Sequence, residues 1–176
     1  MVIPRRILLL SGLAITTSLP TAMALAQGSK STRKITLGQS IPLTGAADQI
    51  GLAYFNGAKM FFDGVNAKNG MVGFKIEMKT LDDGYSAAKA AANARQLLDD
   101  GVDALFGFAG TASCDAAYAL AKTAGVPFFA PFAASDSLYD AANTNAFLVR
   151  PAMADEAYKI VRHCATLNQN RIAVFA

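Results

Sequence analysis

Two hydroxyl side chains stand where an apolar run of the sequence gives way to an alanine-rich stretch. The run from Ala104 to Phe108 ends in small residues, and Thr111 and Ser113 precede the alanines. This order predicts a buried strand, a turn and the start of a helix. The first turn of a helix carries unpaired N–H donors and a partial positive charge, so it can hold an anion without a lysine. The hydroxyls therefore either cap this helix or help to hold a negatively charged group.

The elements that must position these hydroxyls alternate between strand and helix patterns along the chain. Short apolar or alternating runs predict strands, and longer runs with helical spacing, several of them ended by glycine, predict helices. On the first helix, Leu52, Phe55 and Phe62 are expected to be buried, and the pairs Phe61-Phe62 and Phe128-Phe129 are assigned to the core. The predicted strands are 35–40, 74–81, 103–108, 126–130, 147–149 and 171–175, and the predicted helices are 51–69, 86–100, 113–124 and 155–167.

This alternation predicts a doubly wound α/β fold, with a parallel sheet covered on both faces. Ligands of such sheets bind beyond the carboxyl ends of the strands, where the strand order reverses. Three loops are predicted at those ends, and all are rich in Thr, Ser, Gly and Ala: 43–50, 109–113 and 132–137. That composition suits a small polar ligand that backbone atoms approach closely.

Neither catalysis nor a metal or cofactor site finds support in the sequence. Phosphate-binding glycine loops and a nucleophile elbow are absent from it, and His163 is the sole histidine, in a late helix. Asp82 and Asp83 follow a predicted strand, and they are expected to cap a turn at Gly84 rather than to form a metal or acid pair. We therefore expect no catalytic residues, no metal and no cofactor.

The charge balance and the cysteines exclude two further classes of protein. The formal net charge is +3, and the basic residues are scattered without a stripe or interleaved aromatics, so no nucleic-acid partner is expected. Cys114 and Cys164 are too few for a disulfide scaffold. We expect two separate, half-buried thiols.

The N-terminus has the pattern of a secretory signal peptide over residues 1–26. Arg5 and Arg6 precede a short apolar segment, 7–15, which is too short to span a bilayer. Small residues at 22, 24 and 26 predict cleavage after Ala24 or Ala26, and residues 27–33 form the expected flexible leader. The arginine pair leaves the general and the twin-arginine export routes open. The mature protein is therefore expected in the periplasm.

The ensemble of motifs from about residue 34 to 175 resembles the amino-terminal lobe of type I periplasmic binding proteins. The nearest group is the branched-chain amino acid and amide receptors of ABC importers. The matching stretches are PLTG, FNGA, VNAKNGMVG, the aspartate pair, GFAGTAS and VPFFAPFAAS. In that family two α/β lobes close on a ligand.

The resemblance implies which residues contact the ligand. Thr111 matches the position whose hydroxyl binds the ligand carboxylate, and the N–H groups at Ala112 and Ser113 assist it. The family's amino acid receptors carry a hydroxyl where this chain has Ala134. Either Ser135 takes over that role or the α-amino group of the ligand is not recognised here, which puts a plain leucine-type ligand in doubt. Arg150 and Asp155 match the crossover between lobes, as hinge or cap residues. The full set implied is Thr44, Ile50, Thr111, Ala112, Ser113, Ala134 and Ser135.

On this resemblance, residues 34–150 form the first lobe, and 151–176 form the crossover and the start of a second lobe that is almost entirely missing. The sequence is accordingly expected to be a fragment or an early-terminated copy. The implied function is capture of a small carboxylate-bearing or amide ligand and its delivery to the membrane permease of an ABC importer. The alternatives are a ligand-sensing receptor domain on the same fold and an exported α/β enzyme.

Overall fold

Parallel strands form a single five-stranded sheet in the computed structural model, which describes residues 33–169 and 171–173. The strands are β1 (Arg33–Ile41), β2 (Phe74–Asp82), β3 (Ala104–Phe106), β4 (Phe128–Phe129) and β5 (Ala146–Phe147). They follow the order β2–β1–β3–β4–β5, and each neighbouring pair is parallel. The order therefore reverses at β1, which is flanked by β2 and β3. The predicted doubly wound α/β fold is confirmed.

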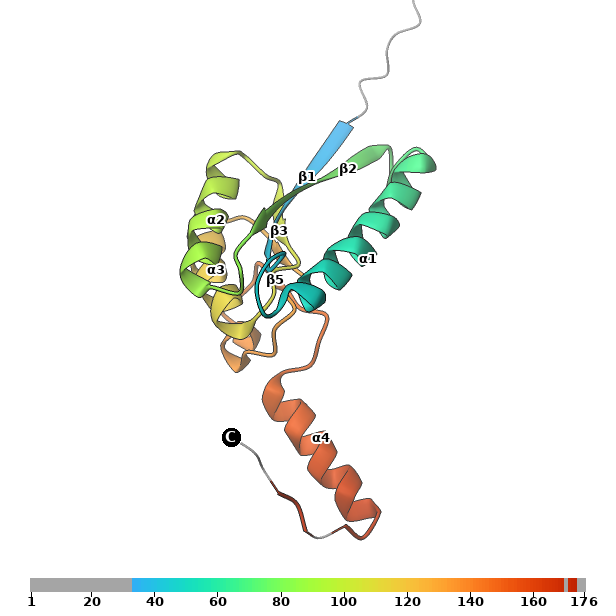
Figure 1. The fold of residues 1–176 in the computed structure, drawn as a ribbon, viewed down its shortest axis with the longest axis vertical. Helices are drawn as coiled ribbons and strands as arrows, with labels where there is room; N and C mark the ends of the chain where they lie inside the picture. Colours follow the sequence, from blue (N-terminus) through green and yellow to red (C-terminus); the bar gives the residue numbers. More distant parts are fainter. Residues whose placement is uncertain (1–32, 170, 174–176) are drawn as a thin grey trace, which may run out of the picture. The chain divides into compact units, whose positions relative to one another are not determined.

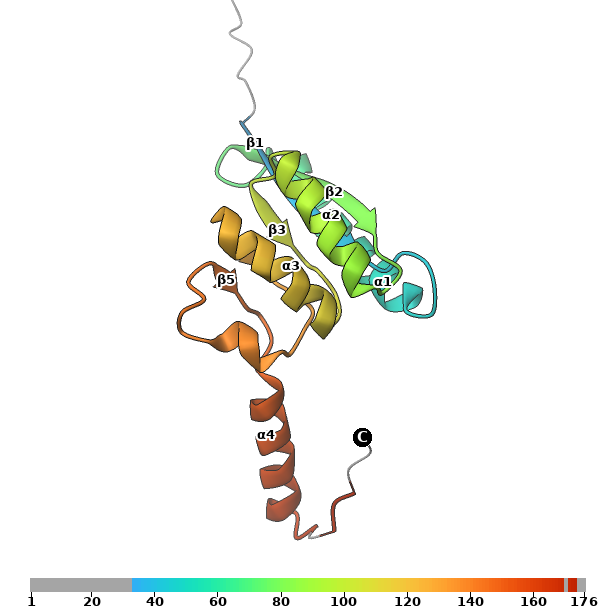
Figure 2. The same ribbon diagram turned by 90° about the vertical axis from the view of Figure 1, so that its left-hand side faces the viewer.

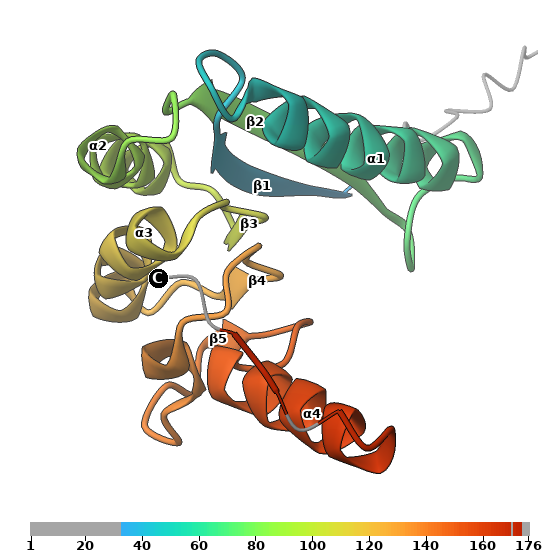
Figure 3. The same cartoon turned by 60° about the horizontal axis from the view of Figure 1, so that its bottom comes forward.

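Helices lie on both faces of this sheet, as Figures 1 and 3 show. Helices α2 and α3 lie side by side on one face (Figure 2), and α1 lies on the other. A 3₁₀ helix, η1, follows β4, and α4 follows β5. The bounds are α1 (Asp48–Ala67), α2 (Ala87–Asp99), α3 (Thr111–Ala124), η1 (Asp136–Tyr139) and α4 (Met153–Thr166).

Local chemistry explains where two of these helices begin and how closely they approach the sheet. The Ser86 hydroxyl caps α2 by accepting a hydrogen bond from the Lys89 N–H at 3.5 Å. Helix α1 runs close to the loop after β1, because Gly51 is buried directly against Pro42. A Cβ atom at Gly51 would collide with the Pro42 carbonyl oxygen, so only glycine permits this approach.

The main core lies between the sheet and the pair α2 and α3. Leu97, Leu105, Phe108, Cys114 and Phe128 are each at most 1% exposed there. Phe108 and Phe128 are in ring contact, with centroids 5.5 Å apart. Burial of such side chains is the main source of stability for this lobe.

Three residues assigned to the core are exposed, and these assignments were wrong. Phe129 is 45% exposed because successive strand residues point to opposite faces, so it leaves the core that Phe128 enters. Phe61 and Leu52 on α1 are 60% and 41% exposed. On the same helix, Phe62 contacts Phe106 of β3 at 5.4 Å between ring centroids, so the Phe62 ring packs directly on the sheet.

Several strands differ from their predicted extents, and β3 spans three residues where six were predicted. Strand β4 spans two residues, where five were predicted, because Pro127 and Pro131 flank it and proline cannot donate to a ladder. The strand predicted at 171–175 is not present in its described part, because residues 171–173 have no strand partner. The rest of that segment lies outside the described residues.

The predicted signal peptide lies wholly outside the described residues, as does all of the predicted leader except Arg33, where β1 already begins. Among the helices that the structure describes, none combines the length and the apolar character needed to cross a membrane.

Candidate functional site

A pocket of about 230 Å³ lies at the carboxyl ends of the strands. Its walls come from all three predicted loops and from the turn after β2, with the start of α4 and the segment before it adding a further wall. This edge, beside the reversal of strand order at β1, is where open α/β sheets bind ligands. The lining residues are Pro42, Ala47, Ile50, Tyr85, Ala109, Gly110, Thr111, Phe132, Ala133, Ala134, Arg150, Met153 and Glu156.

Helix α3 begins at this pocket without a side-chain cap. Gly110 is the N-cap residue, so the alternative that the Thr111 or Ser113 hydroxyl caps the helix is wrong. The Cys114 N–H donates to the Gly110 carbonyl at 2.8 Å. The N–H groups of residues 111–113 come before that first bond and have no acceptor within the helix. Their donors and the helix dipole favour an anion at this position.

Gly110 is required by its own backbone and by its neighbour. Its φ angle is 91°, a backbone conformation that residues other than glycine rarely adopt. A Cβ atom there would lie 2.8 Å from Cε2 of Tyr85, so the Tyr85 ring stands directly against the start of α3. The aromatic ring therefore forms a wall beside the helix N-terminus.

The structure brings three of the predicted ligand contacts together. Ile50 from α1, Thr111 from α3 and Ala134 from the loop after β4 all line the pocket. Thr111 is exposed, Ile50 is 55% exposed, and Ala134 is buried. Ligand binding by these residues stays a prediction.

Two predicted contacts on α3 do not line the pocket. Ser113 is only 3% exposed, and Ala112 is exposed at the helix surface. In these two residues, only the backbone N–H groups are candidates for binding an anion.

Ser135 is held by other side chains and does not line the pocket. Its hydroxyl lies 3.2 Å from Oδ2 of Asp115 on α3 and 2.8 Å from the Ser137 hydroxyl. The Ser137 hydroxyl donates to the other oxygen of Asp115 at 3.0 Å. This cluster ties the loop after β4 to α3, so Ser135 supports the pocket from outside.

Thr44 likewise acts between loops and does not line the pocket. Its hydroxyl donates to Oδ2 of Asp82 at 2.5 Å. Oδ1 of Asp82 accepts from the N–H groups of Leu43 and Gly84, at 2.8 and 2.9 Å. These hydrogen bonds lower the pKa of Asp82 to about 2, and the bond from the Thr44 hydroxyl has the largest effect.

The neighbouring aspartate also serves the loops, as the turn-capping interpretation predicts. Asp83 accepts from the Ser40 hydroxyl at 2.8 Å and from the Tyr85 N–H at 2.8 Å. Burial raises the pKa of Asp83, and these hydrogen bonds oppose the rise. No cluster of three metal-ligating side chains occurs among the described residues.

Four side chains on the pocket wall were not predicted to lie there: Tyr85, Phe132, Met153 and Glu156. Arg150, expected to be a hinge or cap residue, lies on the same wall. The Arg150 guanidinium lies 5.0 Å from the centre of the Phe132 ring, and its Nη2 donates to Glu156 Oε1 at 2.9 Å. No local motif marks these residues, because the fold brings them together from separate loops.

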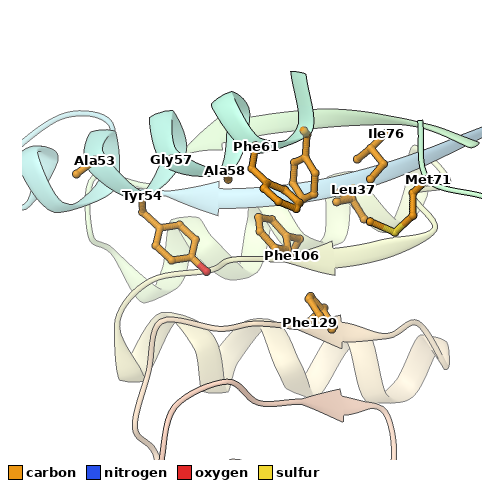
Figure 4. Close-up of a pocket in the computed structure, with 11 residues that line it drawn as sticks. Leu37, Ala53, Tyr54, Gly57, Ala58, Phe61, Met71, Ile76, Phe106 and Phe129 are labelled. Carbon is orange, nitrogen blue, oxygen red and sulfur yellow. The ribbon is translucent and has the colours of Figure 1, made fainter. Parts of the chain in front are cut away.

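A second, larger cavity of about 710 Å³ lies between α1 and the sheet (Figure 4). Phe106 and Phe129 rise into it from β3 and β4, and Phe61 and Tyr54 enter it from α1. No charged residue lines it, so it offers no partner for a carboxylate. The smaller pocket is the better candidate for a polar ligand.

The titratable residues that were set aside lie away from the pocket lining. His163 is exposed on α4. Cys114 and Cys164 are both free, as predicted. Cys114 is fully buried rather than half-buried, and its thiol lies 3.4 Å from the Phe108 carbonyl oxygen.

Residues 34–176 match the family model described as periplasmic binding protein. The chain belongs to the periplasmic binding protein family. The resemblance to type I periplasmic binding proteins is thereby confirmed, and the family consists of solute-binding proteins rather than enzymes.

Individual relatives of this periplasmic binding protein agree with the family match. Leu/Ile/Val-binding protein homolog 7 of Brucella suis is 28% identical over 82% of this chain and 36% of its own length. The isoleucine complex of a branched-chain amino acid transporter substrate-binding protein from Streptococcus pneumoniae is 30% identical. The TM-score is 0.63, with 68% of this chain and 34% of that one covered. A substrate-binding periplasmic protein from Ralstonia solanacearum is 26% identical with a TM-score of 0.69, covering 76% of this chain and 38% of that one. This periplasmic binding protein chain therefore spans little more than a third of the length of such relatives.

Proposed function

We propose that this chain forms the first lobe of an extracytoplasmic receptor for a small carboxylate-bearing ligand: an amino acid, an amide or a related acid. The receptor delivers that ligand to the membrane permease of an ABC importer. The observation that carries the proposal is the uncapped N-terminus of α3, which opens on the pocket beside the Thr111 side chain. N–H donors, a hydroxyl and the helix dipole meet there, and together they favour a carboxylate.

The proposed organisation follows the family. Residues 1–26 act as a cleaved export signal, 27–32 as a leader and 33–150 as the first lobe, and 151–176 lead into a second lobe. The second lobe closes over the pocket and excludes water from the ligand. Export places the receptor in the periplasm, where a permease can accept its ligand. Periplasmic binding proteins from Brucella suis and Streptococcus pneumoniae, with names that refer to branched-chain amino acids, support an amino acid or a close analogue as the ligand class.

The test compares two variants of the full-length, two-lobed receptor by calorimetric titration with a series of small carboxylates. Thr111→Ala removes the hydroxyl at the helix start, and we expect it to weaken binding by roughly 1–3 kcal/mol, the value of a hydrogen bond to a charged group. Thr123→Ala is the matched control, because this exposed hydroxyl in the last turn of α3 donates to the Ala119 carbonyl and does not line the pocket. Equal affinities for the wild type and Thr111→Ala would contradict the assignment.

A further inference from the structure

Two charged side chains line the pocket, and they are paired with each other. Arg150 and Glu156 form an ion pair of 2.9 Å, and their side chains are 35% and 34% exposed. The Arg150 guanidinium also lies over the Phe132 ring at 5.0 Å. The guanidinium is therefore held by a ring and by a carboxylate at once. Such a partly buried pair presents a fixed donor group and a fixed acceptor group to the pocket.

The pair lines the same pocket as the start of α3, and Phe132 connects the two. The Phe132 ring lies under the Arg150 guanidinium, and the Phe132 carbonyl accepts a hydrogen bond from the Gly110 N–H at 3.1 Å. The Tyr85 ring lies against Gly110. A ligand in this pocket can therefore offer one group to the N-terminus of α3 and another to the Arg150–Glu156 pair.

The chemistry of the pair restricts that second group. A guanidinium has five N–H donors, and one of them is used by Glu156. The Glu156 carboxylate keeps further acceptor capacity. A second carboxylate on the ligand would be attracted by Arg150 but repelled by Glu156. An ammonium group would be attracted by Glu156 but repelled by Arg150. A carboxamide satisfies both, because its carbonyl accepts from the guanidinium while its NH₂ donates to the carboxylate. It also loses less hydration than a charged group when it enters the pocket.

We propose that the Arg150–Glu156 pair recognises a carboxamide, so that the site selects ligands that bear a carboxylate at one end and an amide at the other. This inference rests on the proposed function, which supplies the carboxylate position at α3. It assigns Arg150 and Glu156 as specificity-determining residues, a role beyond that of a hinge.

The test uses acids with the same carbon chain and different far ends. Pentanoate ends in a methyl group, glutarate in a carboxylate, 4-carbamoylbutanoate in a carboxamide and 5-aminopentanoate in an ammonium group. Titration of the full-length, two-lobed receptor by calorimetry, or by amide chemical shifts for weak binding, gives the four affinities. We expect 4-carbamoylbutanoate to bind about tenfold more tightly than each of the others, the gain from hydrogen bonds to charged partners.

Two substitutions test the role of each partner. Glu156→Gln removes the opposing charge, so glutarate should approach or exceed 4-carbamoylbutanoate in affinity. Arg150→Gln should abolish the preference for 4-carbamoylbutanoate over pentanoate. Each preference is a ratio within one variant, so partial loss of folded protein does not alter it.

The outcomes separate this inference from the proposed function. Equal affinities for the four acids, or tightest binding of glutarate or 5-aminopentanoate by the wild type, would overturn the carboxamide assignment. If Thr111→Ala still weakened all of them, the proposed function would stand. Absence of binding by every acid would overturn both.

Discussion

The hydroxyl of Thr44, in the loop after β1, donates a 2.5 Å hydrogen bond to Asp82, the last residue of β2. The backbone N–H of Thr44 donates to the same carboxylate at 3.3 Å. Together with the Leu43 and Gly84 N–H groups, these bonds join two loops that border the pocket. The Asp82 carboxylate therefore fixes the loop that leads to Ile50.

We expect Asp82→Asn to lower the melting temperature at neutral pH, because the amide has one acceptor oxygen where the carboxylate has two. The pKa of Asp82 is about 2, below its ordinary value of 3.8. A lowered pKa in the folded state stabilises the fold fully above the ordinary value, and this stabilisation is lost as the pH falls through about 2. The difference in melting temperature between wild type and variant should therefore shrink on acidification.

Asp63→Asn is the control for this experiment. Asp63 forms an exposed pair with Lys59 on α1, and such pairs contribute little to stability. Its substitution should leave the melting temperature nearly unchanged. If the difference in melting temperature between wild type and Asp82→Asn stayed constant down to strongly acidic pH, the stabilising role of the Asp82 carboxylate would be contradicted.

Tyr54→Phe tests the link between α1 and the loop after β4. The Tyr54 hydroxyl donates to the Ala130 carbonyl at 2.8 Å, and burial raises the pKa of this phenol. Loss of this partly buried bond should reduce the free energy of unfolding by about 0.5–1.5 kcal/mol, measured by urea denaturation. Tyr158→Phe, on the exposed surface of α4, should have no measurable effect. Equal results for the two variants would rule out a stabilising role for the Tyr54 bond.

Gly110→Ala should destabilise the lobe, by about 1–3 kcal/mol for a side chain held at positive φ. The new methyl group would also press on the Tyr85 ring. Adding Tyr85→Ala should recover the steric part of the loss and leave the backbone part. Gly57→Ala is the matched control, because a Cβ atom there meets nothing within 4 Å. In the interior of α1, this change should stabilise by about 0.5–1 kcal/mol. Equal losses at both glycines would refute the explanation.

The two thiols should react with iodoacetamide at very different rates. Burial raises the pKa of Cys114 far above its usual range, and its side chain is 0% exposed. Cys164 on α4 is partly exposed. At mildly alkaline pH, peptide mass spectrometry should find Cys164 alkylated and Cys114 unmodified until urea unfolds the protein. Early modification of Cys114 would show that the core opens.

The sequence predicted the strand and helix alternation well, because each element carries its own periodicity. Burial was predicted less well, since it depends on partners. Phe61 and Phe62 look equivalent in the sequence, but the orientation of α1 exposes Phe61 and turns Phe62 toward Phe106. Strand β4 has only two residues because prolines flank it. The apolar pattern alone does not show that these prolines limit strand pairing.

The site was predictable where one loop determines it and not where several loops meet. Thr111 lies in the first turn of a helix, and the residues next to it in the sequence are enough to predict that this helix begins there. Arg150 and Tyr85 come from segments distant in sequence, and only the fold places them on one pocket. Ser135 has a hydroxyl suited to a ligand, but Asp115 on α3 engages it instead.

Residues that shape the pocket surface can be substituted with little effect on the stability of the fold. Ile50 and Tyr85 line the pocket and are 55% and 58% exposed, while the backbone around them is held by Gly51 and by the two aspartates. Substitutions at such exposed positions typically change stability by within about 0.5 kcal/mol. Mutation can therefore alter the shape of the pocket without unfolding the lobe. This arrangement would let members of the family diverge in the pocket surface while they keep a common scaffold.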